Sequence, residues 1–422
     1  MTFLWAVLAG LGFFALMMAS IALHEVGHLL PAKLFGVKVP MYFVGFGKRI
    51  WSVRRGETEY GIKWIWLGGY VRLVGMYPPG KPGRTGRLAE WADGAREAER
   101  DDITETDIRT GRLFYQKKSW QKLIIMAGGP IMNIVLAFFI FLGINLAYGQ
   151  QQQTLGVSAV TDCLQPAPVA CVAPPAKQAG VQVGDTLVAL NGTNVTTWRE
   201  LVVLVRGQGD GALTFTVDRP GQGRVTLPTV HGVMHQVSDL NDPSKTVTAG
   251  FAGMSSGVTT VRVGPVGTAQ DMWKMTTQSV RALGTFPQKV FMTGYNLATG
   301  KPRDATGPLS VVGASVAASE IATTNQLTLG GRIASYFSLL GAVNLFVAIL
   351  NLVPLLPFDG GHIAGALWEA LRRAMARLFK RPAYGFFDTA TLLPVAYVVG
   401  AFLAIAGVIL VVADIVSPIR IF

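Results

Sequence analysis

Charge is scarce in this chain, and it is almost absent from the first stretch. Only 15% of the 422 residues are charged, whereas half are hydrophobic. The run from Phe3 to Leu34 is apolar apart from His24, Glu25 and His28, with no further charge until Lys33. A run of this length predicts a membrane-spanning helix, which needs about 20 apolar residues. It also lacks the basic N-terminal region of a cleaved signal peptide, so we expect it to be retained.

Cysteine is nearly absent as well. Cys163 and Cys171 are the only two in the chain, and they lie close together in the one long polar insertion. Paired cysteines are typical of oxidising compartments outside the cytoplasm. We therefore interpret them as a candidate disulfide in an extracytoplasmic domain.

Acidic residues are outnumbered by basic ones, 25 against 37, which gives a net charge of +12. Basic residues that flank membrane helices and orient them explain this excess. We therefore expect the lipid bilayer to be the partner of these side chains, and no nucleic acid.

The three ionisable residues of the first run have the spacing of a metal site. In the sequence HEVGH, His24 and His28 are four residues apart and project from one helix face, with Glu25 beside them. Ionisable residues inside a membrane helix are expensive and indicate function. Two imidazoles suit zinc, and a catalytic zinc needs a third protein ligand and an open position for water. The alternative, a pair of core histidines, does not explain Glu25.

A third ligand is expected from the end of a later apolar run. Pro354 and Pro357 should break that helix, and Asp359 follows them at the expected membrane edge. Lys and Arg content predicts that this helix and the HEVGH helix both run inward, so their ends meet at one depth. The alternative is that Asp359 only caps a helix beginning at His362. His362 is itself a further candidate ligand, for which we favour a supporting or structural role.

Composition divides the chain into membrane spans and polar segments. The predicted fold class is an α-helical multi-pass membrane protein with about four spans, a membrane-associated β-hairpin and one inserted α+β domain. The expected segments are the HEVGH span 1–36, the β-hairpin 37–76, a charged cytoplasmic loop 77–120, a second span 121–149, the inserted domain 150–232, a linker with a membrane-surface amphipathic helix 233–330, a third span 331–361, a cytoplasmic loop 362–390 and a fourth span 391–416.

Lys and Arg also set the expected orientation. The first polar loop, residues 31–122, holds 18 of them, and the loop after Asp359 is basic too. Both loops should therefore be cytoplasmic. The two termini and the inserted domain are then predicted to be extracytoplasmic, in agreement with the cysteines.

The inserted domain contains AGVQVGDTLVALNG at residues 179–192, a helix end, a Gly-Asp turn, a β-branched strand and an Asn-Gly turn. This pattern resembles a PDZ domain. The resemblance implies a peptide groove bordered by the strand Leu155–Gly156–Val157, where an extended segment adds to the sheet. The alternative is a small β domain that only spaces the helices.

HEVGH, GGPIMN at residues 128–133, the inserted domain and NLVPLLPFDGG at residues 351–361 together resemble the bacterial site-2 proteases. This family of intramembrane zinc metalloproteases includes the regulator-of-sigma-E protease. A single PDZ-like domain with a cysteine pair is most similar to the actinobacterial branch. Phe358 stands where the family usually has leucine, which leaves the ligand assignment intact.

The resemblance implies one Zn²⁺ per chain, held by His24, His28 and Asp359, with Glu25 as catalytic base. Gly68, Gly69 and Tyr70 would end a membrane re-entrant β-loop that pairs with an extended substrate, and Asn351 would hold substrate near the zinc. The implied substrates are single-span membrane proteins such as anti-sigma factors, after a first extracytoplasmic cut. Regulated intramembrane proteolysis in the bacterial cytoplasmic membrane is the implied process.

Two other functions compete with this one. A non-catalytic scaffold would bind peptides through the PDZ-like domain and use zinc for stability, but it would have no need of Glu25. A zinc transporter would need polar groups along a path through the bilayer. The polar residues here are instead expected to cluster at one depth.

Overall fold

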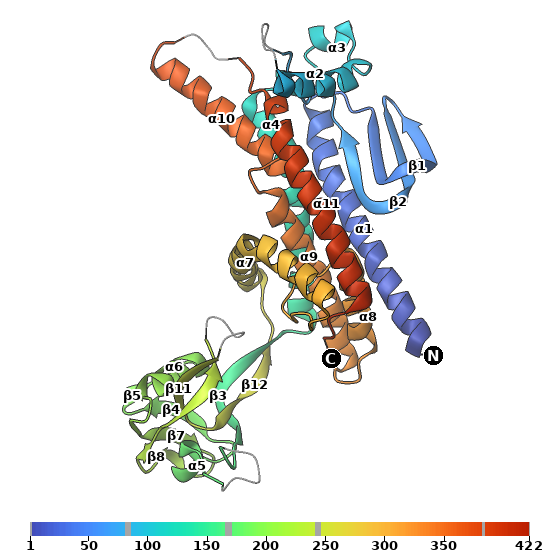
Figure 1. Ribbon diagram of the computed structural model, residues 1–422. Coiled ribbons are helices and arrows are strands. Elements are labelled where there is room, and N and C mark those ends of the chain that lie inside the picture. The colour runs from blue at the N-terminus through green and yellow to red at the C-terminus, as the bar shows by residue number, and fades with distance from the viewer. Residues whose placement is uncertain (1, 81–85, 165–170, 241–245, 382–384, 422) are drawn as a thin grey trace. The chain divides into compact units, whose positions relative to one another are not determined.

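The protein divides into two compact units. A computed structural model describes residues 2–80, 86–164, 171–240, 246–381 and 385–421. The first unit comprises Met1–Leu146 and Gly264–Phe422, and the second, inserted unit is Ala147–Val263 (Figure 1). Each unit has its own architecture.

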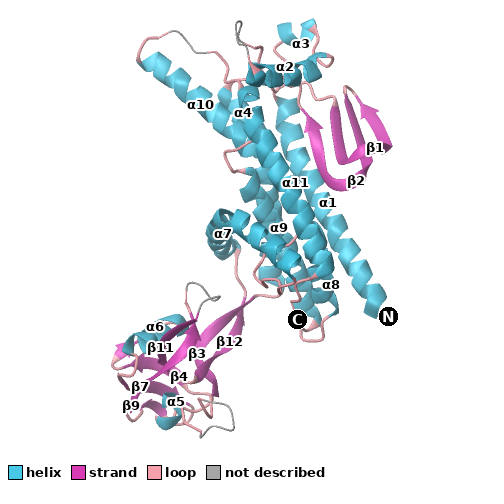
Figure 2. Ribbon diagram, viewed as in Figure 1, coloured by secondary structure: helices cyan, strands magenta, loops and turns pink. Residues whose placement is uncertain are grey.

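Helices build most of the first unit (Figure 2). Within the described residues, four stretches are long and apolar enough to cross a membrane: Phe3–Leu34, Ser119–Ala147, Leu329–Asn351 and Thr389–Val416. They correspond to helices α1 (Thr2–Leu34), α4 (Ser119–Ala147), α9 (Leu329–Asn351) and, after the short 3₁₀ turn η2 (Thr389–Leu392), α11 (Leu393–Val416). Large apolar side chains lie on their outer faces, such as Phe3 at 82% and Val398 at 71% exposure. Such a surface suits hydrocarbon.

Glycines bring α1 and α4 into backbone contact. A Cβ atom on Gly128 would overlap the carbonyl oxygen of Gly27, and one on Gly27 would overlap the carbonyl oxygen of Gly128. Close approach of this kind is the reason why small residues favour packing of membrane helices. The contact fixes α4 beside the HEVGH motif.

A curled sheet follows α1, formed by β1 (Met41–Arg55) and β2 (Thr58–Arg72). The sequence predicts a simple hairpin here, and the turn between Arg54 and Glu59 forms one. However, Tyr42 pairs with both Tyr60 and Val71, so each strand bends and contributes two segments. The order of segments is 49–55, 58–63, 41–44 and 69–72. The bends contain glycines with positive φ, Gly45 at 91° and Gly68 at 156°, where other residues would be strained.

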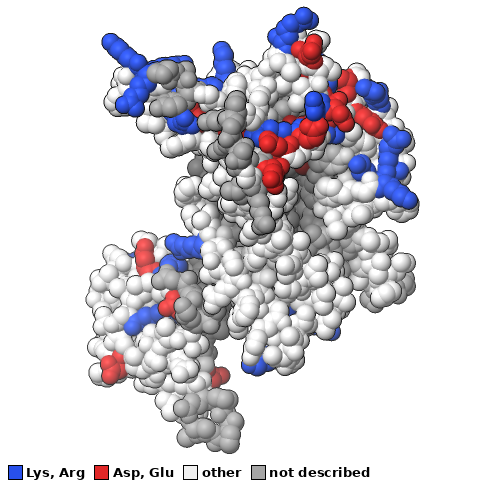
Figure 3. Space-filling model, turned by 45° about the horizontal axis from the view of Figure 1, so that its top comes forward, with Lys and Arg blue, Asp and Glu red and all other residues white. Residues whose placement is uncertain are grey.

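A charged cap comprises α2 (Arg87–Arg100), α3 (Glu105–Arg109) and the 3₁₀ turn η1 (Phe114–Gln116). Ion pairs join it to its neighbours: Lys38 Nζ lies 2.7 Å from Asp107 Oδ2, and Arg96 lies 2.7 Å from Asp388. Figure 3 shows charge gathered over this cap, the sheet and the far end of the helix after Asp359. In the same view the membrane-spanning helices present almost no charged side chains.

Two helices occupy the region for which the sequence predicts one surface helix. α7 (Pro265–Thr299) is followed by α8 (Val311–Thr323), which packs against α1 and α9 through a cluster that includes Phe13, Ala314 and Leu340. Asp414 of α11 accepts hydrogen bonds from the backbone N–H groups of Ser310 and Gly313, at 2.7 and 3.2 Å. Its carboxylate therefore holds the N-terminus of α8, which benefits from a negative charge.

α10 (Asp359–Leu378) starts at Asp359, after a non-helical stretch at residues 352–358. The prolines break the chain as expected, but the helix begins at Asp359 and not at His362. Its middle is anchored by a buried ion pair, with Lys122 Nζ of α4 2.9 Å from Glu369 Oε2. Breaking a buried pair leaves an uncompensated charge, so α10 is firmly tied to α4.

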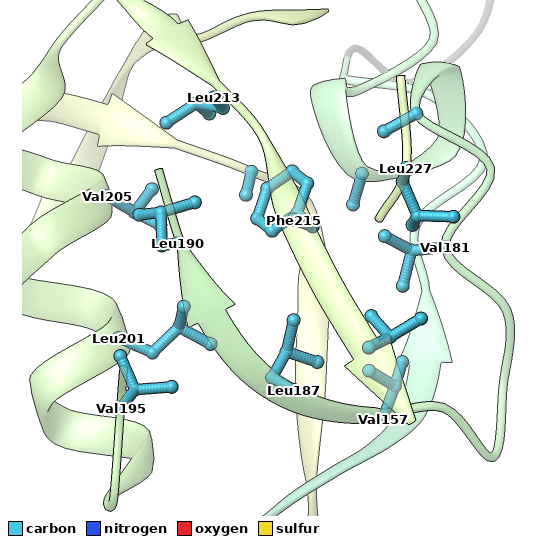
Figure 4. Close-up of a cluster of buried hydrophobic side chains, with 14 of the residues drawn as sticks. Val157, Val181, Leu187, Leu190, Val195, Leu201, Val205, Leu213, Phe215 and Leu227 are labelled. Carbon is cyan, nitrogen blue, oxygen red and sulfur yellow. The ribbon is translucent and has the colours of Figure 1, made fainter. Parts of the chain in front are cut away.

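The inserted unit is built on a sheet in the order β12–β3–β4–β7–β8, with β5 paired to β4. A buried cluster that includes Leu187, Leu201 and Phe215 fills its core (Figure 4). The elements are β3 (Gln150–Val160), α5 (Pro175–Gln178), β4 (Thr186–Leu190), β5 (Thr193–Asn194), α6 (Trp198–Gln208), β6 (Ala212–Leu213), β7 (Phe215–Arg219), β8 (Gly223–Thr226), β9 (Val230–His231), β10 (Val233–Ser238), β11 (Thr246–Phe251) and β12 (Met254–Val261). Cys163 and Cys171 form a disulfide.

This unit extends beyond residue 232, where the sequence prediction ended it. The residues interpreted as linker form β10, β11 and β12, and β12 returns to pair with β3 over most of its length. Val157 is paired with Ser256 of β12 and also hydrogen-bonded to Asp185. The strand at 155–157 is therefore an inner strand, and the expectation that a peptide adds to its edge is wrong.

Candidate metal centre

Three side chains from two distant parts of the chain meet beside the C-terminal half of α1. His24 and His28 are both buried on α1, and Asp359 is the first residue of α10. Nε2 of each histidine lies 3.3 Å from Asp359 Oδ2, and the two Nε2 atoms are 3.3 Å apart. Among the described residues this is the one cluster of three His, Cys, Asp or Glu side chains with metal-binding spacing.

The cluster fits a tetrahedral metal ion. Bonds of ~2.0 Å to nitrogen and oxygen, as zinc makes, place tetrahedral ligand atoms about 3.3 Å apart. His28 Nδ1 lies 2.8 Å from the carbonyl oxygen of Ile125, to which it donates, so its Nε2 is left as an acceptor. Asp359 Oδ2 is buried without a hydrogen-bond donor. Lone pairs that converge in this way repel one another unless a cation lies between them.

The glycines after Asp359 allow this geometry. A Cβ on Gly360 would overlap the backbone at Leu352 and Val353, and one on Gly361 would lie 2.7 Å from the backbone nitrogen of Leu356. Side chains at these positions would push the start of α10 away from the preceding loop. The sequence Asp-Gly-Gly thus lets α10 begin where its carboxylate reaches α1.

α4 closes another side of the cluster at Gly129. A Cβ on this glycine would overlap Nε2 of His28 and lie 2.7 Å from Nε2 of His24. The sequence analysis gave the glycines of α4 only as part of the GGPIMN motif and missed their contact with the imidazoles. Two adjacent glycines before Pro130 in an apolar run were the available signal.

Glu25 is half-buried beside the histidines and faces the end of β2. A Cβ on Gly69 would come within 3.2 Å of Glu25 Cγ, and the backbone amide of Val71 faces the carboxylate. Tyr70 lies between them in sequence, stacks on Phe43 and accepts a hydrogen bond from Lys63 at 2.8 Å. The segment 69–72 is paired on one side only, with 41–44, so its other side is a strand edge beside Glu25.

The remaining predicted site residues fall in different places. Asn351, the last residue of α9, has its Nδ2 3.4 Å from Nε2 of His24. His362 lies within α10, and its Nδ1 is buried without a partner, outside the three-residue cluster. Leu155, Gly156 and Val157 belong to β3 of the inserted unit. The structure thus gathers His24, Glu25, His28, Asn351, Asp359 and the segment containing Gly68, Gly69 and Tyr70 around one centre.

Comparison with known proteins agrees with this geometry. Residues 12–393 match the model of peptidase family M50. Zinc metalloprotease Rip1 of Mycobacterium tuberculosis is 32% identical over 433 residues, which cover 98% of each chain. Rip1 of Mycolicibacterium smegmatis is equally similar, and metalloprotease MmpA of Caulobacter vibrioides is 25% identical over 366 residues, 85% of each chain. The matches include the whole cluster and the inserted unit.

Proposed function

The chain belongs to peptidase family M50, the site-2 metalloproteases, and from this premise we propose that it is a zinc-dependent intramembrane endopeptidase. The observation that carries the proposal is the meeting of His24, His28 and Asp359 at 3.3 Å, with a carboxylate beside them in an apolar helix. The protein is located in the bacterial cytoplasmic membrane. Both termini and the inserted unit are extracytoplasmic, as the distribution of Lys and Arg predicts.

His24, His28 and Asp359 would hold one Zn²⁺. Once bound, the ion would supply Lewis acidity, which lowers the pKa of a water molecule toward neutrality and polarises the scissile carbonyl. Glu25 accepts the proton of the attacking water and later delivers it to the leaving amine. The Ile125 carbonyl keeps His28 in the required tautomer. Asn351, next to His24, donates a hydrogen bond that holds the substrate carbonyl near this centre.

The free edge of residues 69–72 binds the substrate as an added strand. A helical substrate hides its amide bonds in intrahelical hydrogen bonds and must unwind before hydrolysis. Unwound backbone in a dry site needs replacement partners. A strand edge supplies them, and its position beside Glu25 aligns the exposed peptide with the base.

The inserted unit restricts which substrates enter. Its PDZ-like sequence and extracytoplasmic place suit a filter that admits single-span proteins, such as anti-sigma factors, only after a first cut has removed their bulky outer part. Because β12 covers β3, this role does not use strand addition at Leu155–Gly156–Val157. Cleavage then releases a cytoplasmic fragment that alters transcription in a stress response.

A non-catalytic scaffold is the second candidate, since a buried zinc site also stabilises a fold. A protease and a scaffold differ in their response to metal removal. We expect chelation of the purified protein to abolish cleavage of a pre-trimmed anti-sigma-type substrate and stoichiometric Zn²⁺ to restore it. A scaffold would lose thermal stability on chelation but show no cleavage at any zinc content, and that result would exclude the protease.

A further inference from the structure

The C-terminal half of α10 is strongly basic. Between Glu369 and Asp388 the sequence contains five Lys or Arg residues and no Asp or Glu. One of the five, Arg373, forms an ion pair with Glu369 at 2.7 Å. Three others are exposed: Arg377, Lys380 and Arg381. Figure 3 shows the resulting patch of basic side chains at the far end of α10. This end of the helix therefore presents positive charge to its surroundings.

A continuous apolar stripe runs along the same helix. Its side chains are 37% to 76% exposed and belong to Leu367, Trp368, Leu371, Met375, Leu378 and Phe379. Their spacing of i, i+1, i+4, i+8, i+11 and i+12 places all six on one side of a helix with 3.6 residues per turn. Glu369, on another side, is only 3% exposed and contacts α4. The stripe therefore faces away from the rest of the protein.

The contacts of Glu369 fix the level of α10 relative to the membrane. Ser119 and Lys122 donate hydrogen bonds to its carboxylate, at 3.3 and 2.9 Å, and both lie in the first turn of the span α4. The middle of α10 is thus at the membrane boundary on the side of the charged cap. Among the described residues, α10 is not one of the stretches apolar enough to cross a membrane. Its C-terminal half leans away from α4 and α11 (Figure 1).

The apolar stripe continues past this boundary. Leu378 and Phe379, in the last turn of α10 and just after it, are 76% and 66% exposed. An apolar surface of this kind is costly in water and marks an interaction site. At a bilayer surface the same side chains lie among acyl chains, and basic side chains around them reach the headgroups.

We propose that residues 369–381 form an interfacial helix that binds anionic phospholipids in the leaflet on the side of the charged cap. The apolar stripe contacts the acyl chains, and Arg377, Lys380 and Arg381 contact the headgroup phosphates. Under the predicted orientation this leaflet is the cytoplasmic one. Binding of this kind selects a class of headgroup, and it is independent of proteolysis.

Electrostatics sets the expected size of the preference. One Lys or Arg close to an anionic membrane surface corresponds to about fivefold in binding. Phosphatidylcholine has no net charge, whereas phosphatidylglycerol is anionic. Even if only one of the three cations contacts a headgroup at a time, phosphatidylglycerol should be preferred beside α10 by about fivefold. High salt should reduce the preference, because exposed charges are screened.

Quenching of a fluorophore by lipid tests the surface. The two cysteines of the chain are joined in a disulfide, so a dye reacts only with an added cysteine, Leu378→Cys. The labelled full-length protein is reconstituted into phosphatidylcholine vesicles with a small fraction of quencher lipid, either nitroxide-labelled phosphatidylglycerol or nitroxide-labelled phosphatidylcholine. The control label is on Leu11→Cys, at a position 61% exposed in the N-terminal half of α1, about 35 Å along the helix from its last residue.

We expect phosphatidylglycerol to reach half-quenching at Leu378→Cys at about one fifth of the fraction that phosphatidylcholine requires. The two quenchers should differ little at Leu11→Cys. The difference at Leu378→Cys should disappear in a triple variant of α10, which carries Arg377→Gln, Lys380→Gln and Arg381→Gln.

A second triple variant is the matched control. It removes the same charge from exposed positions of the curled sheet through Lys48→Gln, Arg54→Gln and Arg55→Gln. We expect it to keep the lipid preference at Leu378→Cys. Both variants should retain zinc, because the buried pair of Lys122 and Glu369 holds α10 between its basic end and Asp359. Zinc content thus shows that the variants are folded.

Equal quenching by the two lipids at Leu378→Cys would overturn the anionic preference. No quenching by either lipid would show that the apolar stripe lies outside the bilayer. If the preference survives the change in α10, or is lost equally in the sheet variant, it belongs to the sheet or to net charge, and the assignment to α10 is wrong.

Discussion

Gly129 lies directly against both histidine ligands of the metal centre, although it offers no chemistry of its own. Any side chain there would occupy the space of the His28 imidazole and press on His24. The glycine therefore acts on the metal through the position of two ligands. A methyl group should act as an overpacking change beside a site that tolerates little displacement.

We expect Gly129→Ala to lose bound zinc and cleavage together. Gly143→Ala is the matched control on the same helix, since a Cβ at Gly143 meets nothing within 4 Å. It should retain zinc and gain up to about 1 kcal/mol of helix stability. Zinc content per chain and cleavage rate are the two measurements. Full zinc occupancy in Gly129→Ala would contradict the close contact between α4 and the histidines.

At this scale the sequence predicts the chemistry but not all of the contacts. His24, Glu25 and His28 follow from helical spacing, and Asp359 follows from the prolines and from the family resemblance. Gly129 and the carbonyl of Ile125 act on residues about 100 positions away in the chain. Local periodicity contains no information about such contacts, so only the packing of α1 against α4 reveals them.

The curled sheet shows the same limit for whole elements. Alternating residues and the turn near Gly56 predict two strands correctly, because both signals are local. The second pairing of residues 41–44, with 69–72, joins segments about 28 positions apart and depends on bends at Gly45 and Gly68. That pairing is what places a strand edge beside Glu25.

If the substrate adds to this edge as a strand, its backbone N–H groups should alternate between bonded and free. We expect N-methylation of single substrate residues near the scissile bond to reduce kcat/KM about three- to tenfold at every second position. The positions between should be little affected. N-methylation outside the apolar segment is the control. A uniform effect at all positions, or none, would contradict strand addition.

On the scale of the whole molecule, the two units are connected in a way that allows their separation. The chain enters the inserted unit along β3 and leaves along β12, and Gln150 pairs with Val261. The two ends of the unit are therefore neighbours. Composition predicts the inserted unit from its cysteines and turns, but the strands after residue 232 resemble a linker in sequence, and their pairing with β3 is long-range.

Replacing residues 148–262 by a short Gly-Ser linker should leave the membrane unit with its zinc. We expect this variant to cleave full-length single-span substrates as fast as pre-trimmed ones, whereas the intact protein cleaves only the trimmed form. Rates for both substrate forms, measured in both proteins, provide the comparison. A filter role for the inserted unit is wrong if the variant still discriminates between the forms while retaining zinc and activity.

The most direct measurement concerns Glu25. Cleavage of a pre-trimmed anti-sigma-type substrate is compared between wild type and Glu25→Gln, with zinc content determined in both. The account predicts equal zinc and a loss of about 10²- to 10⁴-fold in rate, because the variant keeps the ligands His24, His28 and Asp359 but lacks the base. Equal cleavage by both proteins would contradict the assignment of Glu25 and the proposed mechanism with it.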